Sequence, residues 1–340
     1  MRWIVTDALP PTALAQPLAQ ALQSANARTS QLLSDLSERF EAQFEASPVQ
    51  ALGCTPGERL LLESLGCVSP AQPVGASLAA LHANVTDSSQ TVWIAELSST
   101  IISPDRATLI TLPWLQASRE QTQSLHEAAH ELLGKPGDAI WLEQIDSGRW
   151  RVHAQFPEHA WLASPAAVQG KDMGDWWPTE AHWRDWRRLL NEIQMCWHEH
   201  PVNIERQQAG EPQINGLWLY GGGCGWTPRA DADVQWIRTL TGAATRGDWQ
   251  QWLLDYQTVF EQLTDAIRVS NAPGQDKMTQ AMIDQTLEII LTGQDRLVRL
   301  KPRHHHWTHR WIQHPGARAV SNFLRGSDKP QPWSSWWNSV

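Results

Sequence analysis

The chain has 340 residues, with 36 acidic against 27 basic side chains, a formal net charge of −9 and a pI of about 5.8. This acidic balance argues against sequence-independent nucleic-acid binding, and the length exceeds that of a usual single-core domain. Leu9–Leu22 is too short and too polar to span a bilayer, and the N-terminus does not resemble a signal peptide, so we expect a cytoplasmic protein without membrane partners. The cysteines lie far apart without metal-site spacing, which favours reduced thiols; they are Cys54, Cys67, Cys196 and Cys224.

Tryptophan is unusually abundant, with 21 residues against 2 tyrosines and 5 phenylalanines. A tryptophan side chain buries a large area but needs a partner for its indole N–H. A tryptophan-rich core is the first interpretation, and stacking of carbohydrate or bases is the second. Stacking of nucleic acid normally comes with basic grooves, which the charge balance does not favour.

The N-terminal part predicts one strand and three helices. The strand covers Trp3–Thr6 and ends at Asp7. The second helix rests on apolar residues spaced four apart, from Leu32 to Phe44. The helices are expected at Ala13–Gln23, Gln31–Ala46 and Glu58–Leu65, and a Pro/Gly-rich joint follows at Ser69–Gly75.

The middle of the chain predicts a compact α+β block over residues 72–164. A helix from Ser118 to Leu133 is expected to be capped by the Ser118 hydroxyl. A hairpin is expected around the turn Asp146–Gly148. The strands of the block are expected at Thr91–Leu97, Ala107–Leu112, Ile140–Glu143 and Arg149–Ala154.

The next segment predicts two helices and a strand. Apolar residues from Trp183 to Trp197, spaced 3, 4, 3 and 4 apart, indicate a helix that Pro201 ends. A short helical turn, Asn203–Ala209, is closed by Gly210. Ile214–Tyr220 is apolar on both faces, which is typical of a central parallel strand.

A run of glycines follows this strand at Gly221, Gly222, Gly223 and Gly225. It is not a dinucleotide fingerprint, because its spacing is wrong and Trp226–Pro228 follow it in place of a helix. Either the run presents backbone N–H groups to an anion, or it is a flexible turn where the strand leaves the sheet.

The C-terminal part predicts helices at Asp248–Ile267 (capped by Asp248) and Thr279–Leu291, and a strand at Arg296–Leu300. The tail, residues 326–340, carries three tryptophans. It either packs against the rest of the chain or stays exposed and adhesive. For the histidine-rich stretch from His304 to His309, a basic surface strip is the first interpretation and an anion-binding site is the second. A metal site through His305 and His309 is the third.

The segment HPVN at His200–Asn203, followed by Arg206, Gly210, Pro212, Asn215 and LWLYGGG, resembles a motif of archaeal-type cofactor-independent phosphoglycerate mutases. Those enzymes are metal-dependent members of the alkaline-phosphatase superfamily. The chain resembles still more closely a bacterial group of RpfE-type regulatory proteins, which are degenerate relatives of the mutases. Further matches, such as PVGASLAAL from Pro73 and SPAAVQGKDM from Ser164, extend the resemblance from the N-terminus to about Pro228.

The chain departs from the mutases where their chemistry occurs. Their metal-binding Asp-Gly pair corresponds to Asp7-Ala8, and their nucleophilic serine to Gly57 or Glu58. Their Pro-His-Asp metal motif corresponds to Pro165–Ala167. Because a two-metal site needs several carboxylate and imidazole ligands, we expect no phosphoryl transfer by this mechanism, no cofactor and no metal, although Asp7 keeps its place.

The resemblance implies an α/β fold with a phosphatase-like, doubly wound sheet and an inserted smaller α+β domain. The expected domains are residues 1–71 with 165–340, the insertion 72–164, and the tail 326–340.

The function implied is that of a pseudoenzyme: a non-catalytic, regulatory, mutase-like protein that binds a small phosphorylated or carboxylated metabolite or a protein partner. Arg206 could pair bidentately with the anion. No catalytic residue is assigned; the ligand-binding residues expected are His200, Asn203, Arg206, Asn215, Gly221, Gly222 and Gly223.

Three alternatives remain open. In the first, His200 and Asn203 cap helix ends and Arg206 pairs with a neighbouring glutamate. In the second, the chain is a phosphoester mutase or hydrolase with a rebuilt site around His200, Arg206 and the loop Gly221–Gly225. In the third, it is an interaction protein that uses its tryptophans.

Overall fold

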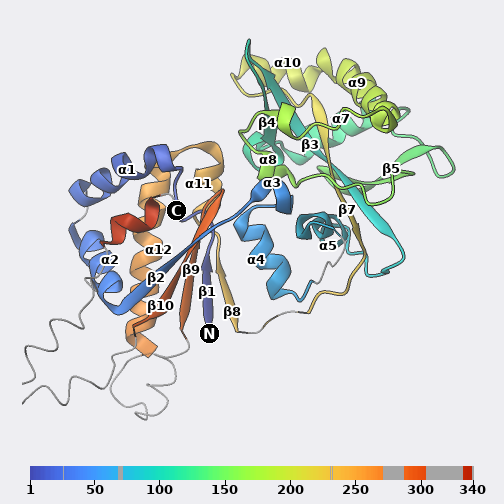
Figure 1. Cartoon of the computed structure of the whole chain (residues 1–340). Helices are drawn as coiled ribbons and strands as arrows, with labels where there is room; N and C mark the ends of the chain where they lie inside the picture. Colours follow the sequence, from blue (N-terminus) through green and yellow to red (C-terminus); the bar gives the residue numbers. More distant parts are fainter. Residues whose placement is uncertain are drawn as a thin grey trace, which may run out of the picture. The chain divides into compact units, whose positions relative to one another are not determined.

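The computed structural model describes residues 1–25, 27–67, 72–229, 231, 233–270, 287–303 and 332–338. The expected site residues His305 and His309, and most of the expected helix Thr279–Leu291, lie outside the described residues. The chain forms two compact units, Met1–Ala46 with Asp233–Val340, and Ser47–Ala232 (Figure 1). Each unit combines one sheet with helices, so the predicted α/β class is confirmed.

The first unit contains a mixed five-stranded sheet. β1 pairs in parallel with β8 and β9, whereas β10 is antiparallel to β9 and β2. In sheet order the strands are β2 (Phe40–Ala46), β10 (Arg296–Pro302), β9 (Glu288–Thr292), β1 (Arg2–Val5) and β8 (Val234–Ile237). The helices are α1 (Thr12–Ala25), α2 (Ala27–Arg39), α11 (Thr241–Arg246), α12 (Trp249–Ser270) and the 3-10 helix η5 (Trp333–Trp337).

Several predicted elements of this unit are confirmed and two are wrong. The opening strand, the first helix, the Asp248-capped helix and the strand from Arg296 are present, and the Asp248 carboxylate accepts from the Gln251 N–H at 3.0 Å. The expected helix Gln31–Ala46 ends at Arg39 and continues as strand β2. The end of the expected helix Thr279–Leu291 lies in strand β9.

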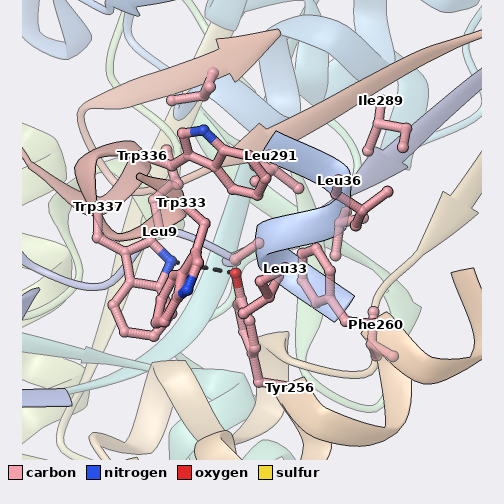
Figure 2. Close-up of a cluster of buried hydrophobic side chains, with 14 of the residues drawn as sticks. Leu9, Leu33, Leu36, Tyr256, Phe260, Ile289, Leu291, Trp333, Trp336 and Trp337 are labelled. Carbon is pink, nitrogen blue, oxygen red and sulfur yellow. Dashed lines mark hydrogen bonds between the residues drawn. The ribbon is translucent and has the colours of Figure 1, made fainter. Parts of the chain in front are cut away.

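The tail is docked. Trp333, Trp336 and Trp337 are buried against α1, α2 and α12 (Figure 2). The Trp337 indole donates to the Tyr256 hydroxyl at 3.2 Å, and its carbonyl accepts from Arg296 Nη2 at 2.7 Å. The aromatic side chains thus complete a core, as the first interpretation of the tryptophans predicts.

The second unit contains an antiparallel sheet in which β3 is central. Its strands are β3 (Thr91–Ile102), β4 (Ala107–Thr111), β5 (Ile140–Asp146), β6 (Arg149–Ala154) and β7 (Gly216–Cys224). Its helices are α3 (Val49–Leu52), α4 (Pro56–Ser64), η1 (Val74–Ser77), α5 (Leu78–His82), α6 (Leu112–Leu115), α7 (Arg119–Ala129), α8 (Pro165–Val168), η2 (Met173–Asp175), η3 (Ala181–Trp183), α9 (Arg184–His198) and α10 (Pro201–Gln208).

Both faces of this sheet are covered. Trp93 and Ala95 of β3 face a core built with α7 and α9, whereas Val92 and Ile94 face a second core built with α5 and α8. The hairpin around Asp146–Gly148 and the capping box of Ser118 on α7 are confirmed.

The prediction of a parallel strand at Ile214–Tyr220 is wrong, because β7 runs antiparallel along β3 from Thr91 to Ser98. A strand buried on both faces has the same continuous apolar sequence in either direction. This pairing joins residues 91–98 to residues 216–224 within the unit Ser47–Ala232, and the bounds of that compact unit differ from those of the expected domains, which stay a prediction.

In the described part of the chain, no helix is long and apolar enough to cross a membrane.

Candidate functional site

The HPVN segment, His200–Asn203, follows α9 and forms the N-cap and the first turn of α10. His200 caps α10, and its Nδ1 accepts from the Val202 N–H at 3.3 Å. Asn203 is fully buried, and its Nδ2 donates to the carbonyls of Trp197 and Ile214 at 2.9 and 2.8 Å. Its Oδ1 accepts from the Ile214 N–H at 2.8 Å. The Asn203 amide therefore links the last turn of α9 to the segment that leads into β7.

Arg206 lies on the same short helix and is 1% exposed. Its Nε donates to the Pro212 carbonyl at 2.8 Å and its Nη2 to the Leu115 carbonyl at 2.7 Å. Its Nη1 contacts the Gln121 amide oxygen and the Glu211 carboxylate, both at 3.0 Å. Each guanidinium nitrogen is engaged within the chain.

Asn215 completes the block by pairing with the backbone of Thr100. Its Oδ1 accepts from the Thr100 N–H at 2.7 Å, and its Nδ2 donates to the Thr100 carbonyl at 3.0 Å. These contacts agree with the alternative in which the block caps helices and pairs Arg206 with a glutamate. Ligand binding by these residues stays a prediction.

Gly221, Gly222 and Gly223 are part of strand β7 and Gly225 follows it, so the expectation of a loop or flexible turn is wrong for the first three glycines. Gly221 and Gly222 have φ values of 114° and 99°, at a bulge opposite Val92 and Trp93. The Gly221 N–H donates to the Leu162 carbonyl at 3.1 Å. A Cβ at Gly221 would lie 2.5 Å from the Ala79 Cβ, so the missing side chain lets α5 pack on the strand.

Asp7 follows β1 in the first unit, at the carboxyl end of the parallel strands, where α/β proteins usually place sites. It has a left-handed backbone with φ of 55°. Its Oδ1 accepts from Gln294 Nε2 at 3.3 Å, and its N–H donates to the Thr292 hydroxyl at 3.2 Å. Burial raises the pKa of Asp7, while hydrogen bonds from Thr241 and Gln294 oppose the rise.

Glu58, one of the two residues at which the sequence resemblance places a nucleophile, has a capping role in the second unit. Its Oε2 accepts from the N–H and hydroxyl of Thr55 at 2.8 and 3.1 Å, and from the Ser164 hydroxyl at 2.7 Å. Ser164 in turn caps α8, which contains Pro165–Ala167. Asp7 and Glu58 thus belong to different units, and the described residues include no group of three or more His, Cys, Asp or Glu that could hold a metal.

A pocket of about 770 Å³ lies at the open end of the β5–β6 hairpin, against η3 and the first turn of α9. Trp141 and His153, a cross-strand pair, stack with ring centroids 3.7 Å apart. Arg151, His182 and Asp185 are among its other lining residues. Sequence reasoning missed this pocket, although Arg151 and His153 alternate with buried residues on β6, the pattern of two polar side chains on one strand face.

No family model and no curated protein matches the chain. Among solved structures, the cofactor-independent phosphoglycerate mutase from Thermoplasma acidophilum DSM 1728 has a TM-score of 0.30 at 11% identity, covering 88% of each chain. The PH0037 protein from Pyrococcus horikoshii has a TM-score of 0.35 at 11% identity, covering 88% of this chain and 86% of that one. Similarities of this size identify neither a family nor an activity.

Proposed function

We propose that the protein is a non-catalytic binding protein whose pocket at the β5–β6 hairpin takes a small anionic metabolite that also carries hydroxyl groups. The observation that supports this proposal is the pocket lining, which combines an arginine and two histidines with carboxylates and an aromatic platform.

Each part of the lining suits one part of such a ligand. The Arg151 guanidinium pairs with carboxylate or phosphate oxygens, and its present partner, Gln90 Oε1 at 2.7 Å, is exchangeable because both groups are exposed. Asp185, in the first turn of α9, can accept hydrogen bonds from ligand hydroxyls. The indole of Trp141 offers an apolar face to the carbon skeleton.

A regulatory role is proposed from the resemblance to the RpfE-type group alone. Support for a non-catalytic role comes from the sequence departures, since Glu58 now caps a helix where the resemblance would place a nucleophile.

The test is a thermal-shift screen against phosphorylated and carboxylated hydroxy acids, with and without manganese. A ligand at 100 times its dissociation constant stabilises the folded state by about 2.7 kcal/mol, which is readily measured. We expect a selective shift that Arg151→Gln removes. Arg188→Gln is the matched control, because Arg188 is exposed on α9, pairs with Glu192 and does not line the pocket.

Two results would overturn the proposal. One is a shift that survives Arg151→Gln unchanged. The other is turnover of a phosphoester that Asp7→Ala abolishes, which would support the enzyme alternative instead.

A further inference from the structure

A cluster of ionisable side chains lies on the α5-facing side of the second unit's sheet, apart from the pocket; Glu96 and Tyr220 are buried, and His82 and Arg149 are half-buried. Glu96 of β3 lies directly opposite Arg149 of β6 in the ladder. On the other side of β3, Tyr220 of β7 places its hydroxyl 2.7 Å from Nδ1 of His82, the last residue of α5. Three strands and one helix therefore each contribute a titratable group.

The charges in this cluster do not balance. The Glu96 side chain is 9% exposed, and none of the hydrogen bonds within the described residues reaches its carboxyl group. The cation that faces it is Arg149, which already pairs with Asp146 at the hairpin turn at 2.9 Å and interacts with the Tyr220 hydroxyl. Glu58 from α4 and Asp146 add further negative charge near Glu96.

Burial, reinforced by Glu58 and Asp146 and opposed by Arg149, raises the pKa of Glu96 to about 7. Burial and Arg149 lower the pKa of His82 to about 4, so its imidazole is neutral and Nδ1 can accept a hydrogen bond from the Tyr220 hydroxyl. Burial raises the pKa of Tyr220 well above its ordinary value. Of these three groups, Glu96 is the one that changes charge near neutral pH.

We propose that Glu96 of β3 and Arg149 of β6 form a proton-binding switch between β3 and the β5–β6 hairpin. With a proton on Glu96, the guanidinium of Arg149 is held by Asp146 within the hairpin. When that proton leaves to solvent, the Glu96 carboxylate competes with Asp146 for the same guanidinium. The Arg149 side chain, at the start of β6, is then drawn toward β3.

The sign of the effect on stability follows from proton linkage. A carboxyl whose pKa is raised by folding binds its proton more tightly in the folded state, so its stabilising contribution is full below pH 4.5 and is lost as the pH rises through about 7. His82 acts in the opposite sense, because stability is lost as the pH falls from 6.5 towards 4. The two effects oppose one another between about pH 4.5 and 7.5, so the comparison of the wild type with Glu96→Gln is what isolates the contribution of Glu96.

The direct test is a carboxyl ¹³C NMR titration of the full chain labelled at glutamate Cδ, with the resonance assigned by Glu96→Gln. We expect one glutamate to titrate near pH 7, to shift to a higher pH in Arg149→Met and to a lower pH in Asp146→Asn. A Glu96 resonance that titrates in the ordinary glutamate range, or that neither variant moves, would overturn the proposal.

Hydrogen exchange tests the mechanical consequence. After correction for intrinsic rates, protection of the hairpin amides (residues 140–154) should fall between pH 6.5 and 8 in the wild type and should not fall in Glu96→Gln. Glu143→Gln is the control, because Glu143 lies on the same hairpin but is exposed and pairs with His153. Equal pH dependence in the wild type and Glu96→Gln would show that the hairpin does not respond to this proton.

Discussion

Arg206 shows how one residue type serves two purposes that a sequence cannot separate. A guanidinium that binds a phosphate and one that binds backbone carbonyls need the same donors in the same fork. Here the donors reach Leu115 and Pro212, which are remote from one another in the sequence. The location of an important arginine and a neighbouring glutamate as one partner were therefore predictable, but the two backbone carbonyls were not.

We predict that Arg206→Gln lowers the free energy of unfolding of the second unit by about 3 kcal/mol, because buried carbonyls lose charged donors. Urea unfolding followed by circular dichroism measures the effect. Arg188→Gln should change the value by less than about 0.5 kcal/mol, since an exposed pair contributes little. An Arg206→Gln protein as stable as the control would indicate that the residue is kept for a ligand.

Gly222 gives a second prediction at this scale. A Cβ there would lie 2.9 Å from the Trp161 Cα, and its φ of 99° is unfavourable for any side chain. We expect Gly222→Ala to lower the free energy of unfolding by on the order of 3 kcal/mol, combining backbone strain with overpacking. Gly210→Ala has a similar left-handed φ of 73° but no neighbour within 4 Å, so it should cost about 1 kcal/mol. Equal losses would show that close packing of β7 is unimportant.

At the scale of elements, the wrong secondary-structure predictions come from sequence patterns that fit both a helix and a strand. The apolar residues Phe40 and Phe44 are four apart, which fits one face of a helix and also one face of a strand. Ala42, between them, packs on the same core as both, as a strand requires. The deciding factor is the pairing of β2 with β10, which lies more than 200 residues away and leaves no local signal. By contrast, capping boxes at Thr55 and Ser118 are local, and the helices they begin were predicted close to their observed starts.

The docked tail yields a prediction for an element. Trp337 is fully buried and its indole hydrogen-bonds Tyr256. We expect Trp337→Ala to lower the free energy of unfolding of the first unit by about 3–5 kcal/mol, because it leaves a large cavity and an unpaired hydroxyl. The adjacent exposed residue supplies the control, since Asn338→Ala should be nearly neutral. Far-UV circular dichroism during thermal unfolding distinguishes the two, and an unchanged Trp337→Ala protein would favour an adhesive tail.

At the scale of the whole molecule, the division into units decides which fragments can fold. The fragment 47–232 keeps β7 beside β3, both cores of the sheet and the contacts of Arg206 with Leu115 and Gln121. The fragment 72–164 matches the expected insertion but lacks β7, α8 and α9, so β3 loses its pairing with β7 and each of its faces loses part of its cover, although α5 and α7 remain. We predict that fragment 47–232 unfolds cooperatively and shows dispersed amide NMR signals, because it retains its own core. Fragment 72–164 should be unfolded or aggregated, since the apolar strand β3 would expose the edge that β7 occupies, and such an edge is a template for association. If instead the shorter fragment folds and the longer one does not, the boundaries lie where the sequence alone suggested.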